Sequence, residues 1–233
     1  MRLTGQVVLI TGAAGSLGRA VAEAFHVAGW KQVLVDVSQA ALDRSYAADA
    51  ARLTLAVDLL DAAAIAQAVT KAQAQFGRID ALCNIAGGFT MGTPVHATPA
   101  ATWKQMMDIN AGTMLNTVQA VVPTMLAAGG GRIVNIGAGA GQKAGGLMGA
   151  YSVSKSAVIR MTEAMSAELR EQGINVNCVL PSIIDTPPNR AAMPDADPSK
   201  WVAPQDLASV ILFLCSDAAK AVHGAALPVV GLS

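Results

Sequence analysis

The sequence predicts an α/β protein built on a single doubly wound parallel sheet of about seven strands, with helices on both faces. Short apolar runs alternate with Ala-rich stretches along the whole chain. The runs are continuously apolar, as in strands that are buried on both faces. With 53% hydrophobic and 14% charged residues, 233 residues suffice for one large core. No composition shift, repeat or low-complexity tail divides the chain, so residues 1–233 are predicted to form a single domain.

The apolar runs give the strands in order: QVVLIT (6–11), QVLVD (32–36), RLTLAVD (52–58), IDALCNIAG (79–87), GRIVNIG (131–137), INVNCVLP (174–181) and AALPVVG (225–231). The Ala-rich stretches between them give helices over 16–29, 39–48, 61–77, about 100–128, about 151–171 and 204–217. Residues 87–99, 137–149 and 182–203 are rich in Gly, Thr or Pro and are predicted as loops. Strands that alternate with helices in this way favour a parallel sheet.

Composition excludes several kinds of partner. The net charge of +0 gives no reason to expect nucleic acid or an anionic membrane. The longest apolar runs fall far short of the ~20 residues that a membrane helix needs. The start, MRLTGQ, lacks the regions of a signal peptide. Cys83, Cys178 and Cys215 are odd in number and set in apolar runs, so we expect reduced core thiols in a cytoplasmic protein. No Cys/His spacing predicts a metal site.

A glycine-rich turn, TGAAGSLG (11–18), joins the first strand to the first helix. Glycines at such a turn let the backbone approach a pyrophosphate, and the helix N-terminus supplies N–H donors and a favourable dipole. The candidate cofactor residues here are Gly12, Gly15, Ser16, Leu17 and Gly18. The same pattern also occurs in βα turns without a ligand, and the position after the first strand favours the cofactor site.

Two aspartates follow the next strands. Asp36 ends the second strand, where a carboxylate accepts hydrogen bonds from ribose hydroxyls and repels a 2′-phosphate. Val37 follows, with no basic residue to bind that phosphate, so NADH is preferred over NADPH. Asp58 and Leu59 follow the third strand and are predicted to flank the adenine. The alternative for these aspartates is a structural role, with Asp58 or Asp61 capping the next helix.

Tyr151 and Lys155 stand four residues apart at the start of a predicted helix and therefore share one of its faces. An ammonium group beside a phenol favours the phenolate, so we expect a lowered pKa for Tyr151. Tyr151 is then a candidate acid/base group. Such pairs are common on solvated helices. A catalytic role for this pair is favoured only because the glycine-rich turn over residues 11–18 predicts a cofactor for it to act with.

Together these motifs resemble the short-chain dehydrogenase/reductase family over essentially the whole chain. The family's TGxxxGxG motif matches Thr11, Gly12 and Gly18, with Ser16 in place of the middle glycine. Its NNAG motif appears as Asn84-Ile85-Ala86-Gly87. Its PGxxxT-like segment appears as Pro181 to Thr186, with Ser182 in place of the glycine. The resemblance implies a Rossmann-like fold that binds NAD(H), with Asn84, Ala86, Gly87, Pro181, Ile184 and Thr186 near the cofactor. It also implies a homodimer or homotetramer formed by the helices around 100–128 and 151–171.

The resemblance also implies catalytic roles. Tyr151 and Lys155 match YxxxK, in which the tyrosine is the acid/base group and the lysine lowers its pKa and binds the nicotinamide ribose. Asn110 matches the family's asparagine, which holds a water in the proton relay. The family's serine lies thirteen residues before the tyrosine, and here that position is Ala138. Loss of one donor to a developing oxyanion typically costs ~3–4 kcal/mol.

Two explanations of Ala138 stay open. Either catalysis is weak and the chain is an NAD-binding sensor or scaffold, or its small-molecule substrate is electrophilic enough to need no donor. The second is favoured by a local resemblance to the quinonoid dihydropteridine reductases of this family, carried by Val35-Asp36-Val37, Ala138-Gly139-Ala140 and residues 180–201. The long segment 182–203 is expected to cover the site. Asn189, Arg190, Met193, Phe89 and Met91 are candidate contacts for a small, uncharged or planar substrate.

Overall fold

The computed structural model describes residues 5–233, so what the sequence predicts for residues 1–4 lies outside the described part. Its strands are β1 (Val7–Thr11), β2 (Lys31–Asp36), β3 (Arg52–Ala56), β4 (Ala81–Asn84), β5 (Gly131–Ile136), β6 (Ile174–Pro181) and β7 (Ala226–Val229). They form one sheet in the order β3-β2-β1-β4-β5-β6-β7, and every neighbouring pair is parallel. The predicted fold class is confirmed.

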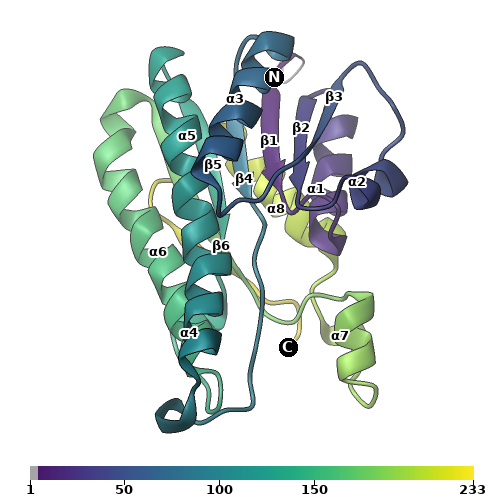
Figure 1. Cartoon of the computed structure of the whole chain (residues 1–233), viewed down its shortest axis with the longest axis vertical. Coiled ribbons are helices and arrows are strands. Elements are labelled where there is room, and N and C mark those ends of the chain that lie inside the picture. The colour runs from purple at the N-terminus through teal and green to yellow at the C-terminus, as the bar shows by residue number, and fades with distance from the viewer. Residues whose placement is uncertain (1–4) are drawn as a thin grey trace.

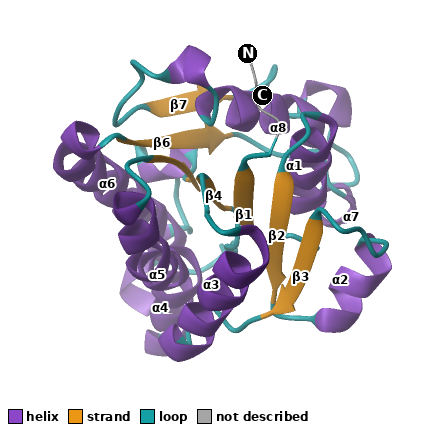
Figure 2. Cartoon of the chain, turned by 90° about the horizontal axis from the view of Figure 1, so that it is seen from above, coloured by secondary structure: helices purple, strands orange, loops and turns teal. Residues whose placement is uncertain are grey.

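Helices cover both faces of this sheet (Figure 2). They are α1 (Ser16–Val27), α2 (Gln39–Ser45), α3 (Ala62–Phe76), α4 (Ala100–Met107), α5 (Thr113–Ala127), α6 (Gly149–Leu169), α7 (Pro187–Ala192) and α8 (Pro204–Leu214). One core lies between the sheet and α3, α5 and α6, and a second lies between the sheet and α1 and α8. Because apolar side chains leave both faces of each central strand, the strands appear in the sequence as uninterrupted apolar runs.

The strand order reverses between β1 and β4, because β2 and β3 extend the sheet in one direction and β4 to β7 extend it in the other. Ligands of such sheets bind outside the carboxyl ends of the strands at this point. Thr11, at the end of β1, holds the two halves together, since its Oγ1 accepts hydrogen bonds from Ile85 N at 3.0 Å and Ala86 N at 3.2 Å. In Figure 1 the chain that follows β4 runs down toward α4 on the left, and the chain that follows β6 runs toward α7 on the right.

Three local details differ from the sequence prediction. The helix expected over about 100–128 contains a π-helical turn at Asp108–Gly112, between α4 and α5. The expected loop 182–203 contains the short helix α7. The strand β3 ends at Ala56 rather than at Asp58. Of the two aspartates that follow, Asp61 is the helix cap, since its Oδ1 accepts from Ala63 N at 2.9 Å and Ala64 N at 3.1 Å.

None of the helices within residues 5–233 combines the length and the apolar character that a membrane crossing requires. Cys83, Cys178 and Cys215 are buried and free, as the sequence predicts. Among the same described residues, His, Cys, Asp and Glu side chains form no group of three or more that could hold a metal ion.

Candidate active site

A cleft of about 1650 Å³ opens at the carboxyl edge of the sheet. Its walls come from the glycine-rich turn, the loops after β2 to β6, and residues of α4, α6 and α7. The sequence-predicted residues that line it are Gly12, Gly15, Ser16, Leu17, Gly18, Asp36, Asp58, Leu59, Phe89, Ala86, Gly87, Met91, Tyr151, Lys155, Pro181, Ile184, Thr186, Asn189 and Met193. Motifs spread over more than 180 residues therefore share one cavity.

The glycine-rich turn is packed too closely to accept larger residues. A Cβ on Gly18 would lie 2.1 Å from Gly12 O and 2.7 Å from Ala13 Cα. Gly12 has a φ of +63°, and a Cβ there would lie 2.9 Å from Ala86 N. At the start of α1, Gly15 provides no side-chain cap, so the first N–H groups of the helix stay available to a ligand in the cleft.

Asp36 lies at the end of β2 beside this turn. Its Oδ2 accepts a hydrogen bond from Ala14 N at 3.0 Å, which orients the carboxylate, and within residues 5–233 Oδ1 has no hydrogen-bond partner. Asp58 lies farther along the same wall and is oriented in a similar way, with its Oδ1 accepting from Leu60 N at 2.9 Å. Both carboxylates therefore line the cleft in fixed positions, on the same wall as the glycine-rich turn.

Tyr151 lies in the first turn of α6. Its ring packs edge-to-face against Phe89, with the ring centroids 4.8 Å apart. Burial raises the pKa of Tyr151 to about 12. The sequence predicts the opposite direction, and that expectation is wrong for this structure because desolvation of the phenolate dominates. A phenol that keeps its proton at neutral pH is suited to donate that proton to a substrate oxygen.

Lys155 lies one helical turn beyond Tyr151 and is 6% exposed. Its Nζ donates to the carbonyl oxygen of Ile136 at 2.8 Å. Burial lowers the pKa of Lys155 to about 8, with a smaller opposing effect from the neighbouring Cys178. The ammonium group thus lies at the bottom of the cleft, held by the end of β5 rather than by a carboxylate.

Two predicted residues support the cleft from behind and do not line it. Asn110 is 2% exposed, and its side chain joins Gly88 to Ser154: its Oδ1 accepts from Gly88 N at 2.9 Å, and its Nδ2 donates to Ser154 Oγ at 2.9 Å. The π turn at Asp108–Gly112 places this side chain between the β4 loop and α6. Asn84 is 5% exposed and donates from Nδ2 to Asn135 Oδ1 at 2.8 Å, within the sheet.

The segment after β6 forms the opposite wall. Thr186 caps α7, where its Oγ1 accepts from Asn189 N at 3.3 Å. The structure does not bring Arg190 to the cleft, because its guanidinium forms two hydrogen bonds with the carboxylate of Asp185, at 2.6 and 2.7 Å. Ala138 does line the cleft, with extended backbone and a side chain that offers no hydrogen bond. The position of the family's serine therefore presents a methyl group.

Sequence reasoning missed several residues of this site, and Met148 and Tyr46 illustrate why. Met148 lines the cleft, but it lies in a glycine-rich loop whose path has no periodic signal. Tyr46 follows α2, and its Oη donates to Ala13 O at 2.6 Å, which supports the glycine-rich turn from outside. No local motif marks Tyr46, because its partner is 33 residues away.

Comparisons with known proteins agree with this geometry. The model of the short-chain dehydrogenase family matches residues 6–197. D-threitol dehydrogenase of Mycolicibacterium smegmatis is 33% identical over 99% of this chain and 93% of its own. Levodione reductase of Leifsonia aquatica is 31% identical over 99% of this chain and 94% of its own. The crystal structure of carveol dehydrogenase from Mycobacterium avium in complex with NAD has a TM-score of 0.90 at 30% identity, covering 99% and 98% of the two chains.

The proteins that this chain resembles over its whole length are dehydrogenases and reductases, so the chain is an oxidoreductase. The chain belongs to the short-chain dehydrogenase/reductase family.

Proposed function

We propose that this protein is an NAD(H)-dependent oxidoreductase that transfers hydride to or from a small electrophilic substrate, a carbonyl or hydroxyl compound or one like a quinonoid dihydropterin. The observation that supports this most directly is that Tyr151 and Lys155 line the same cleft as the glycine-rich turn and Asp36. The residues fit the dinucleotide, since the turn has no room for a Cβ at Gly18 and leaves the α1 N-terminus open. When bound, the nicotinamide ring supplies or accepts the hydride.

Each residue has a definite part in this proposal. Asp36 accepts hydrogen bonds from the adenosine ribose and disfavours a 2′-phosphate, so NADH is preferred over NADPH. Lys155 orients the nicotinamide ribose. In reduction, Tyr151 donates its proton to the substrate oxygen, in keeping with its raised pKa. Its use as a base requires positive charge nearby to lower that pKa, and Lys155 is the nearest source along the helix.

Asn110 is proposed to be a positioning residue rather than a group that contacts the substrate. Its bonds to Gly88 and Ser154 hold the β4 loop against α6, where Lys155 lies. Close packing supports this part, since a Cβ on Gly87 would lie 2.7 Å from Asn110 Oδ1 and 3.3 Å from Lys155 Nζ. We propose that Asn110 keeps the proton path beside Lys155 open and aligned, as the family resemblance implies.

The protein is further proposed to be a single domain that assembles as a homodimer or homotetramer. Leu115 and Leu126 on α5 and Val153 on α6 are large apolar side chains that are at least 38% exposed. An apolar helix pair of this kind is suited to pack against a second copy.

Turnover with NADH tests the function. We expect NADH oxidation with activated carbonyl compounds, and a lower dissociation constant for NADH than for NADPH. If NADH binds but no activated ketone, quinone or quinonoid dihydropterin is reduced, the chain is a sensor or scaffold and the proposal is wrong. A lower dissociation constant for NADPH would refute the role given to Asp36.

Ala138→Ser tests why the family's serine is absent. A serine restores a hydrogen-bond donor for the developing oxyanion, so kcat with an ordinary, unactivated ketone is expected to rise roughly tenfold or more. With an activated substrate little charge needs stabilising, and kcat is expected to stay within about threefold. Steady-state kinetics on both substrates separates these effects. An equal gain on both would contradict the idea that the natural substrate is activated.

A further inference from the structure

The wall of the cleft around Tyr151 is apolar. We call this region the substrate end and define it by Phe89, Met91, Ala138, Met148, Tyr151 and Met193, all of which line the cleft. Phe89 touches the Tyr151 ring and is nevertheless 58% exposed, and Met91 is 54% exposed. Large apolar side chains that stay exposed inside a cleft indicate a site for an apolar ligand.

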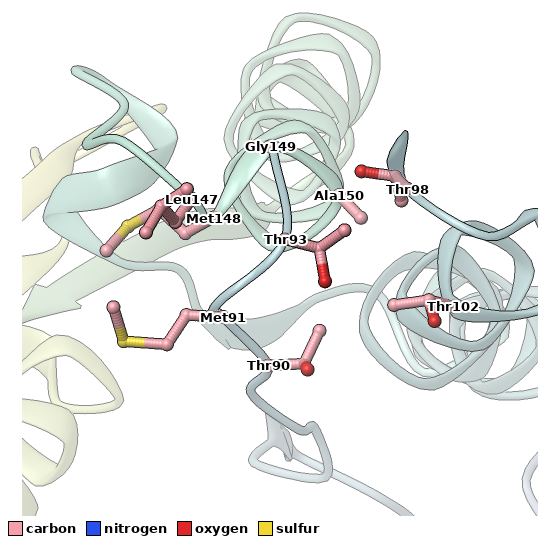
Figure 3. A pocket seen from close by; sticks show the side chains of 9 residues that line it. All are labelled: Thr90, Met91, Thr93, Thr98, Thr102, Leu147, Met148, Gly149 and Ala150. Atoms are coloured by element: carbon pink, nitrogen blue, oxygen red, sulfur yellow. The ribbon is translucent and has the colours of Figure 1, made fainter. Parts of the chain in front are cut away.

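Backbone pairing between two loops directs the methionines into the cleft. Gly92 N donates to Leu147 O at 2.8 Å, and Thr93 forms a parallel bridge with Met148. Gly92 between Met91 and Thr93 has a φ of +111°, so the regular alternation of side chains along an extended strand is interrupted there. Figure 3 shows Met91 and Met148 extending to the same side, whereas Thr90 and Thr93 lie on the other side with Thr98 and Thr102. The loops thus present thioethers to the large cleft and direct hydroxyl groups away from it.

On the α7 wall, the polar side chains already have partners within the protein. Asn189 Nδ2 donates to Ile184 O at 2.8 Å. Thr186 Oγ1 accepts from Asn189 N. Ser182 Oγ donates to Val230 O at 2.7 Å. Each of these side chains gives one polar atom to the protein itself. The Thr186 hydroxyl can still donate and Asn189 Oδ1 can still accept, so these two atoms are the polar contacts that this wall offers.

On the α4 wall, the charges are also paired. Lys104 and Asp108 form an ion pair one helical turn apart. Gln105 lies between them on the exposed part of α4, and its side chain forms no hydrogen bond with the described residues of the protein. A substrate held against Tyr151, Phe89 and Met91 therefore meets the Tyr151 hydroxyl and otherwise mostly apolar atoms.

The scarcity of polar side chains around Tyr151 favours some substrate classes over others. A polyol or a pterin carries several donors and acceptors, and each one buried without a partner costs binding free energy. A carbonyl compound with an apolar body directs its one reacting oxygen to Tyr151 and buries the rest against thioether and aromatic groups, which adapt well to flat rings. The methyl group of Ala138 excludes a second donor and requires a carbonyl carbon that is already electrophilic.

We propose that the substrate is an apolar, ring-bearing carbonyl compound activated by an adjacent carbonyl group, without hydroxyl or amino substituents. This inference rests on the proposed hydride-transfer function. The carbonyl carbon receives hydride from NADH, which becomes NAD⁺, and the oxygen receives the Tyr151 proton. The C=O π bond is thereby replaced by a C–H and an O–H bond.

Reduction kinetics with NADH tests the substrate class. We expect kcat/KM for 1-phenylpropane-1,2-dione to exceed that for fructose, erythrulose and quinonoid dihydropterin by about a hundredfold. A higher value for a ketose or for the dihydropterin would overturn this inference while leaving the proposed function intact. Absence of turnover with every acceptor would overturn the proposed function itself, and this inference with it.

Matched methionine variants show whether the substrate end carries the selectivity. Met91→Gln and Met193→Gln keep side-chain length and replace the thioether by an amide. Each is expected to lower kcat/KM for the dione roughly tenfold, mainly through KM, with the NADH dissociation constant unchanged. Met107→Gln is the control, because Met107 lies on α4 outside the cleft lining, and it is expected to behave as wild type. Unchanged kinetics in both cleft variants would contradict the inference.

Discussion

At the scale of single residues, Lys155 shows what the sequence allows and what it does not. The YxxxK spacing predicts that Lys155 and Tyr151 share a helix face, and both line the cleft. Spacing contains no information about burial, however, and burial determines both pKa values. The pKa of Tyr151 consequently moves in the direction opposite to the sequence prediction. The same holds for Arg190, whose partner Asp185 could not be identified from spacing alone.

The pH dependence of stability tests the buried lysine. Its pKa of about 8 in the folded protein lies below the unfolded value of about 10.4. Below pH 8 both states bind the proton, and the buried charge costs stability. Between about pH 8 and 10.4 only the unfolded state keeps the proton, so this contribution to the free energy of unfolding rises with pH. The total gain is up to roughly 3 kcal/mol.

Lys155→Met removes this titration and leaves Tyr46 and Tyr151 in place. The free energy of unfolding of the variant relative to wild type is therefore expected to fall by up to roughly 3 kcal/mol from pH 7 to pH 10. Urea denaturation of both proteins at several pH values measures this difference. A difference that stays constant across the range would show that Lys155 is not charged and buried in the folded protein.

At the scale of elements, the sequence predicts where strands and long helices lie, but it does not predict local changes in helical hydrogen bonding. The π turn at Asp108–Gly112 adds one residue within a helical pattern, and periodicity over 100–128 does not reveal it. It matters because Asn110 lies within it, and such bulges are frequent at functional sites. For α7 a signal was present, since Thr186 before Pro187 is the pattern of an N-cap followed by proline at the first helical position.

The turn between β1 and α1 makes the sharpest prediction for an element. In Gly18→Ala, the new Cβ would lie 2.1 Å from Gly12 O, so the backbone of the turn must move. The dissociation constant for NADH is expected to rise roughly tenfold or more, because backbone shifts of this kind cost about 1–3 kcal/mol. Gly146→Ala is a matched control, since a Cβ there meets no atom within 4 Å. Fluorescence titration of NADH with wild-type affinity in Gly18→Ala would contradict the role of the turn.

At the scale of the whole molecule, the alternation of strands and helices predicts a parallel sheet with helices on both faces, because strands that are apolar on both faces must be covered on both. The position of the cleft follows from the reversal of strand order between β1 and β4. Within the substrate end, the sequence predicts Phe89, Met91 and Met193 as contacts, and all three line the cleft. It does not predict Met148, or that side chains from three separate loops come together. Their convergence depends on loop pairing such as the Thr93–Met148 bridge.

Hydride transfer in Tyr151→Phe tests the central claim most directly. The variant keeps the ring that packs against Phe89 and loses only the hydroxyl that donates the proton. Single-turnover oxidation of bound NADH by the best carbonyl acceptor is expected to slow by roughly 10²–10⁴-fold, with the NADH dissociation constant within about threefold of wild type. A variant that binds NADH normally and oxidises it at the wild-type rate would show that Tyr151 is not the proton donor.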